Sequence, residues 1–428
     1  MNFSDLHPNI RIRIVTSFLT RLVGMMIFPF MAIYFSDKLG QALAGVLLFV
    51  TICAQILMGF YGGYLADRWG RKKVMVYGQW AQCFAFVIMA LANSPWLDSA
   101  WLTFVMMLVQ NASNGMINPA ADAMLIDVST KENRTFMYSI NYWATNLSIA
   151  IGSVFGGLLF ATHRFELLSV LTLVSMFTLF LTAYYMQESY HNIASSNPPV
   201  NGTGIIKDLI NSYKQVMTDR RFLLFSLGGL FIFSIEFQTS NYVAVRLAQE
   251  FVPQHIHLWD WFSFELTGIK VFGFIQLENT LLIVCLSLIV TKLIKYMPEA
   301  SALHFSALFY IVGYAVIAYS NSLVIITLAM LLATIGELIH IPTRQTYLAQ
   351  LVRDDARSSY MAVNGLVLQG ARIMGSIAIS MGALLPSMVM AILFLIMGLT
   401  GLLLVRNVVN QLTLQHTPNP PHAKEAAQ

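Results

Sequence analysis

The most informative ionisable side chain of this sequence is Glu337, which lies in the middle of a long apolar segment. His340 follows three residues later, so the two side chains share one face if the segment is helical. Pro342 comes next, and a proline removes a backbone donor and bends a helix. Burial at low dielectric disfavours an ionised carboxylate, which lets Glu337 exchange a proton near neutral pH. A cationic molecule would compete with that proton for the same carboxylate.

Other ionisable side chains also interrupt apolar segments, where each charge costs about 2.5–3.5 kcal/mol on membrane-insertion scales. They are Arg21, Glu236 with Gln238 and Asn241, Glu278 with Asn279, and Arg372. In one interpretation the carboxylates exchange protons or bind substrate, and His340 assists them. In the other, Glu337 forms a permanent ion pair with Arg372 or Arg21, and His340 is a packing residue. The two arginines either balance buried acids or bind an anionic substrate.

The apolar segments themselves indicate the class of protein. The chain has 428 residues, of which 57% are hydrophobic and 11% are charged. Soluble domains are about 45–50% apolar and about 25% charged. The apolar residues form long continuous blocks, which predicts membrane-spanning helices rather than the alternating strands of a barrel. We therefore expect an all-α integral membrane protein.

The blocks predict twelve transmembrane helices, because each span needs roughly 20 mainly apolar residues. The expected spans are 14–36, 42–66, 74–93, 100–125, 136–161, 166–187, 222–248, 267–291, 301–320, 322–349, 358–384 and 387–406. We expect an N-terminal six-helix bundle (1–187), a cytoplasmic linker (188–221), a C-terminal six-helix bundle (222–409) and a disordered cytoplasmic tail (410–428). The loop from Glu250 to Leu266 contains Trp259 and Trp261, which suit anchoring at the membrane surface.

Basic residues gather in alternate connections between the spans. One set of connections contains Arg68, Arg71, Lys72, Lys73, Lys131, Arg134, Lys207, Lys214, Arg220, Arg221, Lys292, Lys295, Arg353 and Arg357. The other set contains little beyond Lys38, His163 and Arg164. Cytoplasmic loops of membrane proteins carry the excess of Lys and Arg. This asymmetry predicts that both termini are cytoplasmic. We expect the protein in the cytoplasmic (inner) membrane of a bacterial cell.

The two halves of the sequence share residues at a constant offset of 223. The matching pairs are Pro119 with Pro342, Arg134 with Arg357, Asn141 with Asn364, and Gly152-Ser153 with Gly375-Ser376. All of them fall in corresponding spans of the two halves or just before them. Parallel repeats of this kind are typical of transporters, which bind substrate between the halves near the membrane midplane. The offset predicts two pseudo-symmetric bundles.

The loop between the second and third spans carries a motif of glycines and charged residues. Gly63 permits close helix approach and Gly70 permits a tight turn, and Asp67 can accept a hydrogen bond from Arg71. The stretch 63–73 resembles the major facilitator signature G-x-L-A-D-R-x-G-R-K. The resemblance implies the major facilitator fold and a cytoplasmic gate. Its residues here are Asp67, Arg68, Gly70, Arg71, Lys72, Asp127 and Arg134, with Asp127 placed to pair with the loop.

A second stretch, 123–152, resembles the drug:proton antiporter group that includes LmrP. The residues that carry the likeness are Asp127, Glu132, Arg134, Asn141, Ser148 and Gly152. The resemblance implies export of hydrophobic cationic drugs in exchange for protons by alternating access, and an acid at Glu337 matches its pattern. This chain departs from the group where Asn141 replaces an expected acid. Gln110 lies in a region where many drug exporters carry an arginine.

A carrier for a narrower substrate, such as a peptide, a sugar, an organic anion or a lipid, stays open as an alternative. Arg21 and Arg372 would then bind an anionic group. The sequence has no nucleotide-binding loop and no zinc-type histidine spacing. We therefore expect no enzyme activity, no cofactor, no metal site and no nucleic-acid partner. The expected partners are a small-molecule substrate, protons and the lipid bilayer, and we expect a monomer.

Overall fold

The chain is almost entirely helical in a computed structural model that describes residues 3–189, 216–259, 262–294, 296–352 and 357–416. The first half contains α1 (Pro8–Met25), α2 (Met31–Leu39), α3 (Gln41–Trp69), α4 (Arg71–Ala92), α5 (Ala100–Val128), α6 (Lys131–Leu159) and α7 (Arg164–Tyr185). The second half contains α9 (Arg220–Phe237), α10 (Ala244–Glu250), α11 (Gly268–Ile294), α12 (Glu299–Tyr319), α13 (Leu323–Leu351), α14 (Arg357–Gly382) and α15 (Ser387–His416).

Short elements complete the described chain. They are the 3-10 turns η1 (Phe3–Asp5) and η2 (Phe28–Phe30), the π-helix η3 (Thr239–Val243), and the strands β1 (Asn93–Ser94), β2 (Leu97–Asp98), β3 (Gln254–Trp259) and β4 (Phe262–Leu266). Each pair of strands forms an antiparallel hairpin.

Ten of the described helical segments are long and apolar enough to cross a membrane. The helices α5 and α14 are 29 and 26 residues long and carry more polar side chains. With these two, the described residues form twelve helical units when α1 is joined to α2 and α9 to α10. The all-α membrane fold expected from the sequence is confirmed.

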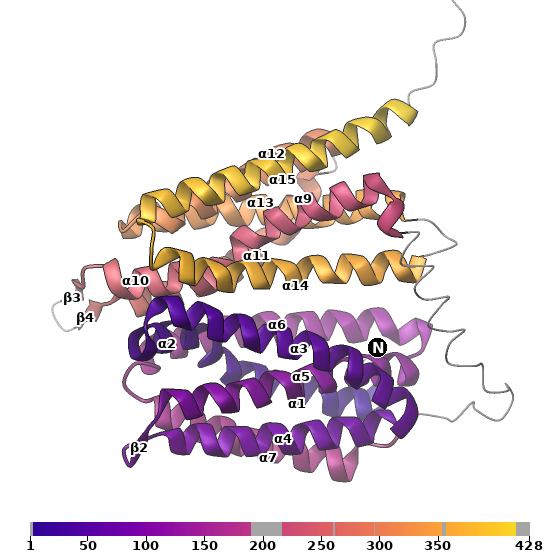
Figure 1. Cartoon of the computed structure of the whole chain (residues 1–428). Coiled ribbons are helices and arrows are strands. Elements are labelled where there is room, and N and C mark those ends of the chain that lie inside the picture. The colour runs from indigo at the N-terminus through magenta and orange to yellow at the C-terminus, as the bar shows by residue number, and fades with distance from the viewer. Residues whose placement is uncertain (1–2, 190–215, 260–261, 295, 353–356, 417–428) are drawn as a thin grey trace, which may run out of the picture.

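The helices separate into two bundles, α1–α7 and α9–α15 (Figure 1). The two hairpins lie at one end of the molecule, which we call the hairpin end. The start of α1 and the end of α15 lie at the opposite end. Most of the expected linker, 190–215, lies outside the described residues, as does 417–428. The last helix continues to His416, so residues 410–416 are helical and not part of a disordered tail.

Two expected continuous spans are interrupted. The first starts at Pro8, a residue tolerated in the first turn of a helix, and is broken by η2, which contains Pro29. The seventh span passes through the π-helix η3 between α9 and α10. The loop after α10 forms the β3–β4 hairpin, which we did not predict; the side chain of Trp259 and all of Trp261 lie outside the described residues.

The constant offset between the halves corresponds to equivalent packing. A Cβ on Gly152 of α6 would lie 2.6 Å from the carbonyl oxygen of Leu22 in α1. A Cβ on Gly375 of α14 would lie 3.1 Å from the carbonyl oxygen of Phe237 in α9. In each bundle a glycine thus lets the fifth helical unit approach the first.

The bundles contact each other near the hairpin end. A Cβ on Gly157, near the end of α6, would lie 3.2 Å from Cα of Gly273 in α11. Ser380 Oγ, near the end of α14, donates a hydrogen bond of 2.6 Å to the carbonyl oxygen of Ala42 in α3. Farther from this end, a Cβ on Gly365 of α14 would meet nothing within 4 Å. We call the contacts of Gly157, Gly273, Ala42 and Ser380 the seam.

Candidate functional site

Glu337 lies on α13 and is buried inside the second bundle, with 9% of its surface exposed. Its carboxyl oxygen Oε2 accepts a hydrogen bond of 3.0 Å from Asn279 Nδ2 of α11. The same amide also contacts Thr334 Oγ1 at 3.1 Å. The structure thus brings together two of the residues singled out in the sequence, from helices far apart along the chain.

Glu236 lies on α9 and accepts a hydrogen bond of 2.5 Å from the hydroxyl of Tyr310 on α12. The Tyr310 ring stacks on the ring of His340, with centroids 6.1 Å apart. Glu236 and Glu337 also interact electrostatically. Glu236, Asn279, Tyr310, Glu337 and His340 therefore form one group, which we call the carboxyl cluster. Tyr310 was not predicted, because a tyrosine within an apolar helix gives no signal of its own.

The two predicted counter-charges do not meet the carboxyl cluster in the described part of the chain. Arg372 Nη1 donates instead to Gln369 Oε1 of its own helix at 3.3 Å. Arg21 belongs to the first bundle and lines a cavity there. The described residues show no ion pair that involves Glu337, and its carboxyl is hydrogen-bonded by the neutral amide of Asn279.

Two other predicted residues stay outside the cluster's hydrogen bonds. Glu278 precedes Asn279 on α11, and its buried Oε2 atom has no hydrogen-bond partner among the described residues. Asn141 lies half-buried on α6, and it lines neither the cavity between α1, α4 and α5 nor the cavity between the bundles. Its repeat partner Asn364 instead accepts a hydrogen bond of 3.0 Å from Arg344.

Arg344 is a buried cation on α13 that sequence reasoning missed. It is 2% exposed and lies between the rings of Phe225 and Phe233, at 5.3 and 5.1 Å from their centroids. It follows Glu337 by seven residues, which places both on one face of the helix. This seven-residue spacing from Glu337 could have identified Arg344 as a candidate from the sequence.

Two adjoining cavities lie in the first bundle and between the two bundles. The first, of about 290 Å³, lies between α1, α4 and α5. The second, of about 310 Å³, lies between the bundles. They share Phe28, Pro29, Gln110 and Asn114 as lining residues, so they are parts of one hollow. Gln110 was noted in the sequence only as a departure from drug exporters.

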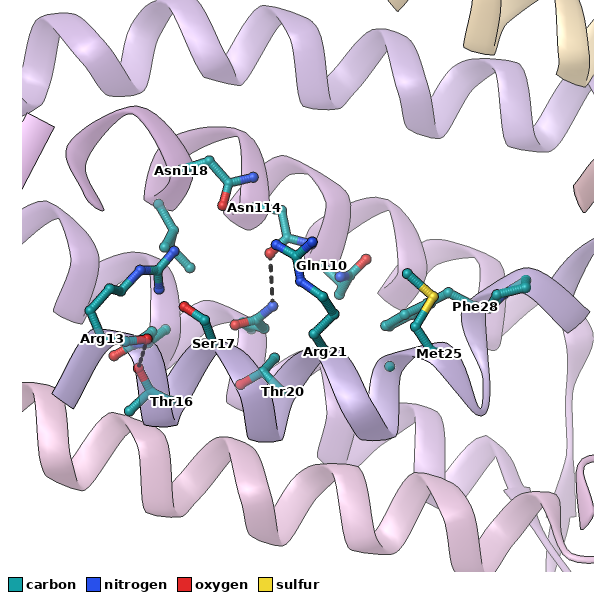
Figure 2. A pocket seen from close by; sticks show the side chains of 15 residues that line it. Arg13, Thr16, Ser17, Thr20, Arg21, Met25, Phe28, Gln110, Asn114 and Asn118 are labelled. Carbon is teal, nitrogen blue, oxygen red and sulfur yellow. Dashed lines mark hydrogen bonds between the residues drawn. The ribbon is translucent and has the colours of Figure 1, made fainter. Parts of the chain in front are cut away.

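Arginines line this hollow. Arg13 and Arg21 line the first cavity, and Figure 2 shows both side chains projecting from α1 towards α5. Arg372 and Asn241 line the second. No carboxylate of the described chain lines either cavity, so the structure separates the acids from the open space. Arg13 precedes the first span expected from the sequence but lies within α1, so the sequence did not indicate it as a lining residue.

The signature loop forms a compact polar contact within the first bundle. Arg71 Nε lies 2.7 Å from Asp127 Oδ2, as the resemblance implied. Gly70 adopts φ +100°, a conformation that favours glycine. Arg68 is exposed and lies over the Tyr64 ring, 5.2 Å from its centroid. The side chains of Asp67 and Arg134 lie outside the described residues, although α3 and α6 include their backbones.

Glu188 adds a contact to this loop that the sequence did not suggest. Its carboxylate accepts hydrogen bonds from the backbone N–H groups of Arg71 (2.9 Å) and Lys72 (3.1 Å) at the start of α4. Free N–H groups at a helix start favour an anion. Glu188 was assigned to the linker, where an acidic residue is ordinary. The described residues contain no group of side chains suited to hold a metal ion.

The chain is 31% identical to the protein named Na(+), Li(+), K(+)/H(+) antiporter of Planococcus maritimus over 387 residues, which cover 90% of this chain and 91% of that protein. It is 25% identical to Multidrug resistance protein MdtH of Blochmanniella floridana over 348 residues, which cover 80% of this chain and 79% of that protein.

The fold is similar to the crystal structure of a POT family transporter in complex with 5-aminolevulinic acid. The TM-score is 0.72 at 14% sequence identity, and the match covers 98% of this chain and 100% of the other. This likeness concerns the fold alone. A family model described as Major Facilitator Superfamily matches residues 14–376. The chain therefore belongs to the Major Facilitator Superfamily of membrane transporters.

Proposed function

We propose that this transporter exports hydrophobic, cationic molecules in exchange for protons, with the carboxyl cluster as its proton site. One observation carries the proposal: Glu337 and Glu236 are held inside the second bundle by neutral partners, the amide of Asn279 and the hydroxyl of Tyr310. A buried carboxylate without a cation is costly, whereas a protonated carboxyl is not. Such a group takes up a proton when enclosed and releases one when water reaches it.

The separation of the cluster from the cavities changes the expected coupling. Cargo in the hollow and a proton on Glu337 would occupy different places, so direct competition for one carboxylate does not describe this conformation. The seventh helical unit connects the two places, because Glu236 belongs to the cluster while Phe237 and Asn241 line the second cavity. The π-helix η3 starts two residues after Phe237. Such wide turns occur often at functional sites, and this one would transmit protonation to the cavity wall.

Alternating access fits the way in which the bundles meet. They are in contact at the seam near the hairpin end. With both termini cytoplasmic, as the positive-inside pattern predicts, this conformation would be closed to the outside. The loop of Arg71 and Asp127 would act as the gate on the cytoplasmic side. We place the protein in the cytoplasmic membrane of a bacterium, as a monomer.

The names of the relatives support exchange of cations and drugs, since they describe an antiporter of monovalent cations with protons and a multidrug resistance protein. A second candidate is a proton-coupled carrier for a narrower substrate, such as a peptide, a sugar, an organic anion or a lipid. The observation that favours it is the arginine lining of the hollow by Arg21 and Arg372.

Reconstituted protein tests the main proposal. Ethidium flux is measured in proteoliposomes with an imposed pH gradient, and again after a protonophore has collapsed the gradient. We expect accumulation against the ethidium gradient only while the pH gradient lasts. Equal accumulation in both conditions would contradict proton coupling. Transport of organic anions but not of ethidium would favour the second candidate.

A further inference from the structure

The first cavity carries more positive charge than the described acids near it can balance. Arg13 and Arg21 both line it from α1, eight residues or roughly 12 Å apart along the helix axis. The carboxyl of Asp122 on α5 interacts electrostatically with both arginines, but it does not line the cavity. One acid thus faces two cations, and no ion pair of either arginine is found within the described residues.

The rest of the lining is rich in hydrogen-bonding groups. They are the hydroxyls of Thr16, Ser17 and Thr20 and the amides of Gln79, Gln82, Gln110, Asn114 and Asn118. Gln82 Nε2 donates to Asn114 Oδ1 at 3.0 Å, which occupies that oxygen and leaves the Asn114 NH₂ group to face other partners (Figure 2). Gln79 and Gln110 are 5% and 3% exposed, and their side-chain oxygens have no partner among the described residues. An amide oxygen only accepts hydrogen bonds, so these two oxygens suit a donor on the cargo, whereas an anion would be bound by the NH₂ groups of the same amides.

We propose that this cavity is a binding site for an oxyanion, either a carboxylate or a phosphate, on an amphiphilic cargo. Two guanidinium groups and several amide donors suit the planar or tetrahedral oxygens of such a group. Its apolar part would pass Met25 and Phe28 into the second cavity, because Phe28 lines both. The inference rests on the proposed transport function. It widens the cargo from cations to hydrophobic molecules that carry an oxyanion, including those that also carry a cationic group.

A matched pair of fluorescent probes tests the site in the purified full chain. The probes are 1-pyrenebutanoate and the uncharged 1-pyrenebutanol, which differ in the anionic group. We expect wild-type protein to bind the carboxylate about tenfold more tightly than the alcohol, which corresponds to about 1.4 kcal/mol. Arg21→Gln should remove this preference, and Arg21→Lys should restore part of it. Equal binding of both probes by wild-type protein would overturn the proposal.

Two further variants guard against a folding effect. Arg13→Gln removes the other cation of the cavity and should also reduce the preference, while Arg406→Gln, an exposed arginine on α15, should leave it unchanged. Because the result is a ratio of two affinities in each variant, partial loss of folded protein does not alter it. A preference that survives both Arg13→Gln and Arg21→Gln would also overturn the proposal.

The source of the oxyanion follows from competition. Displacement of bound 1-pyrenebutanoate by a short-chain phosphatidylglycerol, but not by glutarate, assigns the site to a lipid headgroup. Displacement by glutarate alone assigns it to a soluble carboxylate, and displacement by neither argues against an oxyanion site. Ethidium transport reports separately on the proposed function: wild-type protein that prefers the carboxylate probe but moves no ethidium with a pH gradient keeps the site and contradicts cationic drug export.

Discussion

At the scale of single residues, the side chain with the clearest consequence is Glu337. Its hydrogen-bond partner is the neutral amide of Asn279, and the described chain shows no ion pair between it and an arginine, so we propose that a proton neutralises it. Asn279 can donate to the carboxyl in either protonation state. A group held in this way can change its charge without rearranging a network of ion pairs.

The change Glu337→Gln keeps an oxygen for Asn279 and imitates the protonated carboxyl permanently. We expect accumulation of ethidium against its gradient to be lost, because the residue can no longer exchange a proton. Ethidium flux down its own gradient should persist. Flux in proteoliposomes measures both modes. The exposed Glu166 at the start of α7 gives a control, and Glu166→Gln should retain both. Full uphill transport by Glu337→Gln would remove this residue from the coupling mechanism.

The sequence indicated candidate residues for the proposed proton site, but not how they are arranged. A carboxyl within an apolar segment is conspicuous because of its cost, and so Glu236 and Glu337 could be found without a structure. Tyr310 could not, because it meets Glu236 only through helix packing. The same reason explains why the arginines, expected as counter-charges of the acids, line a separate cavity instead.

At the scale of secondary-structure elements, Arg246 connects α10 to the end of α12. Its guanidinium donates to the carbonyl oxygens of Tyr319 (3.0 Å), Ile317 (3.1 Å) and Ser320 (2.7 Å). The last carbonyls of a helix lack partners within the helix, and a cation there is favourable. Arg246 is 2% exposed and therefore shielded from water.

Replacement of this cation gives a prediction about stability. Arg246→Met should lower the free energy of unfolding by about 3 kcal/mol, because it leaves buried carbonyl oxygens without donors. Thermal unfolding of the purified protein in detergent measures the change. Lys38→Met removes a cation from the exposed pair Lys38–Asp98 and should alter the unfolding temperature little. Equal effects of the two changes would show that the contacts of Arg246 are not stabilising.

Two glycines of different surroundings form a matched test of helix packing. Gly157 of α6 faces the backbone of Gly273 in α11, whereas a Cβ on Gly365 of α14 would meet open space. Gly157→Leu should therefore prevent closure of the seam and reduce transport at least about tenfold, a barrier increase of about 1.4 kcal/mol. Gly365→Leu should be tolerated. Initial rates of ethidium flux compare them, and similar rates would mean that the contact at Gly157 is dispensable.

The sequence predicted which segments are helical, since a long apolar segment that crosses a membrane must form a helix to satisfy its backbone hydrogen bonds. It did not predict their interruptions. The break at η2 contains Pro29, which was visible, but the π-helix η3 has no comparable signal in Thr239–Val243. The extension of α15 to His416 was missed because its last turns are polar and were taken for a tail.

At the scale of the whole molecule, the two bundles should move relative to each other during transport. The seam is the place where the described conformation would resist that movement, because Ser380 is bonded to Ala42 across it. The proposed alternating access would require these residues to separate.

A crosslink across the seam tests this movement. In a variant whose Cys53, Cys83 and Cys285 are replaced, Ala42→Cys and Ser380→Cys should be joined by a short bis-methanethiosulfonate, which forms a disulfide with each thiol and releases methanesulfinate, and transport should stop. Cleavage of a reducible reagent should restore it, and each single cysteine variant should remain active after treatment. Continued transport by the fully crosslinked protein would show that the bundles do not part at this end.

The wide turn of η3 has one more consequence for the seventh helical unit. A π-helix holds one residue more per turn than the α-helix on either side, so it contains slack that can be taken up without unwinding the backbone. Arg246 fastens the far side of that turn to α12. A change of η3 from π-helix to α-helix would therefore rotate α9, which carries Glu236. In this helical unit α10 is therefore held in place, and α9, which carries an acid of the proposed proton site, is the part that can rotate.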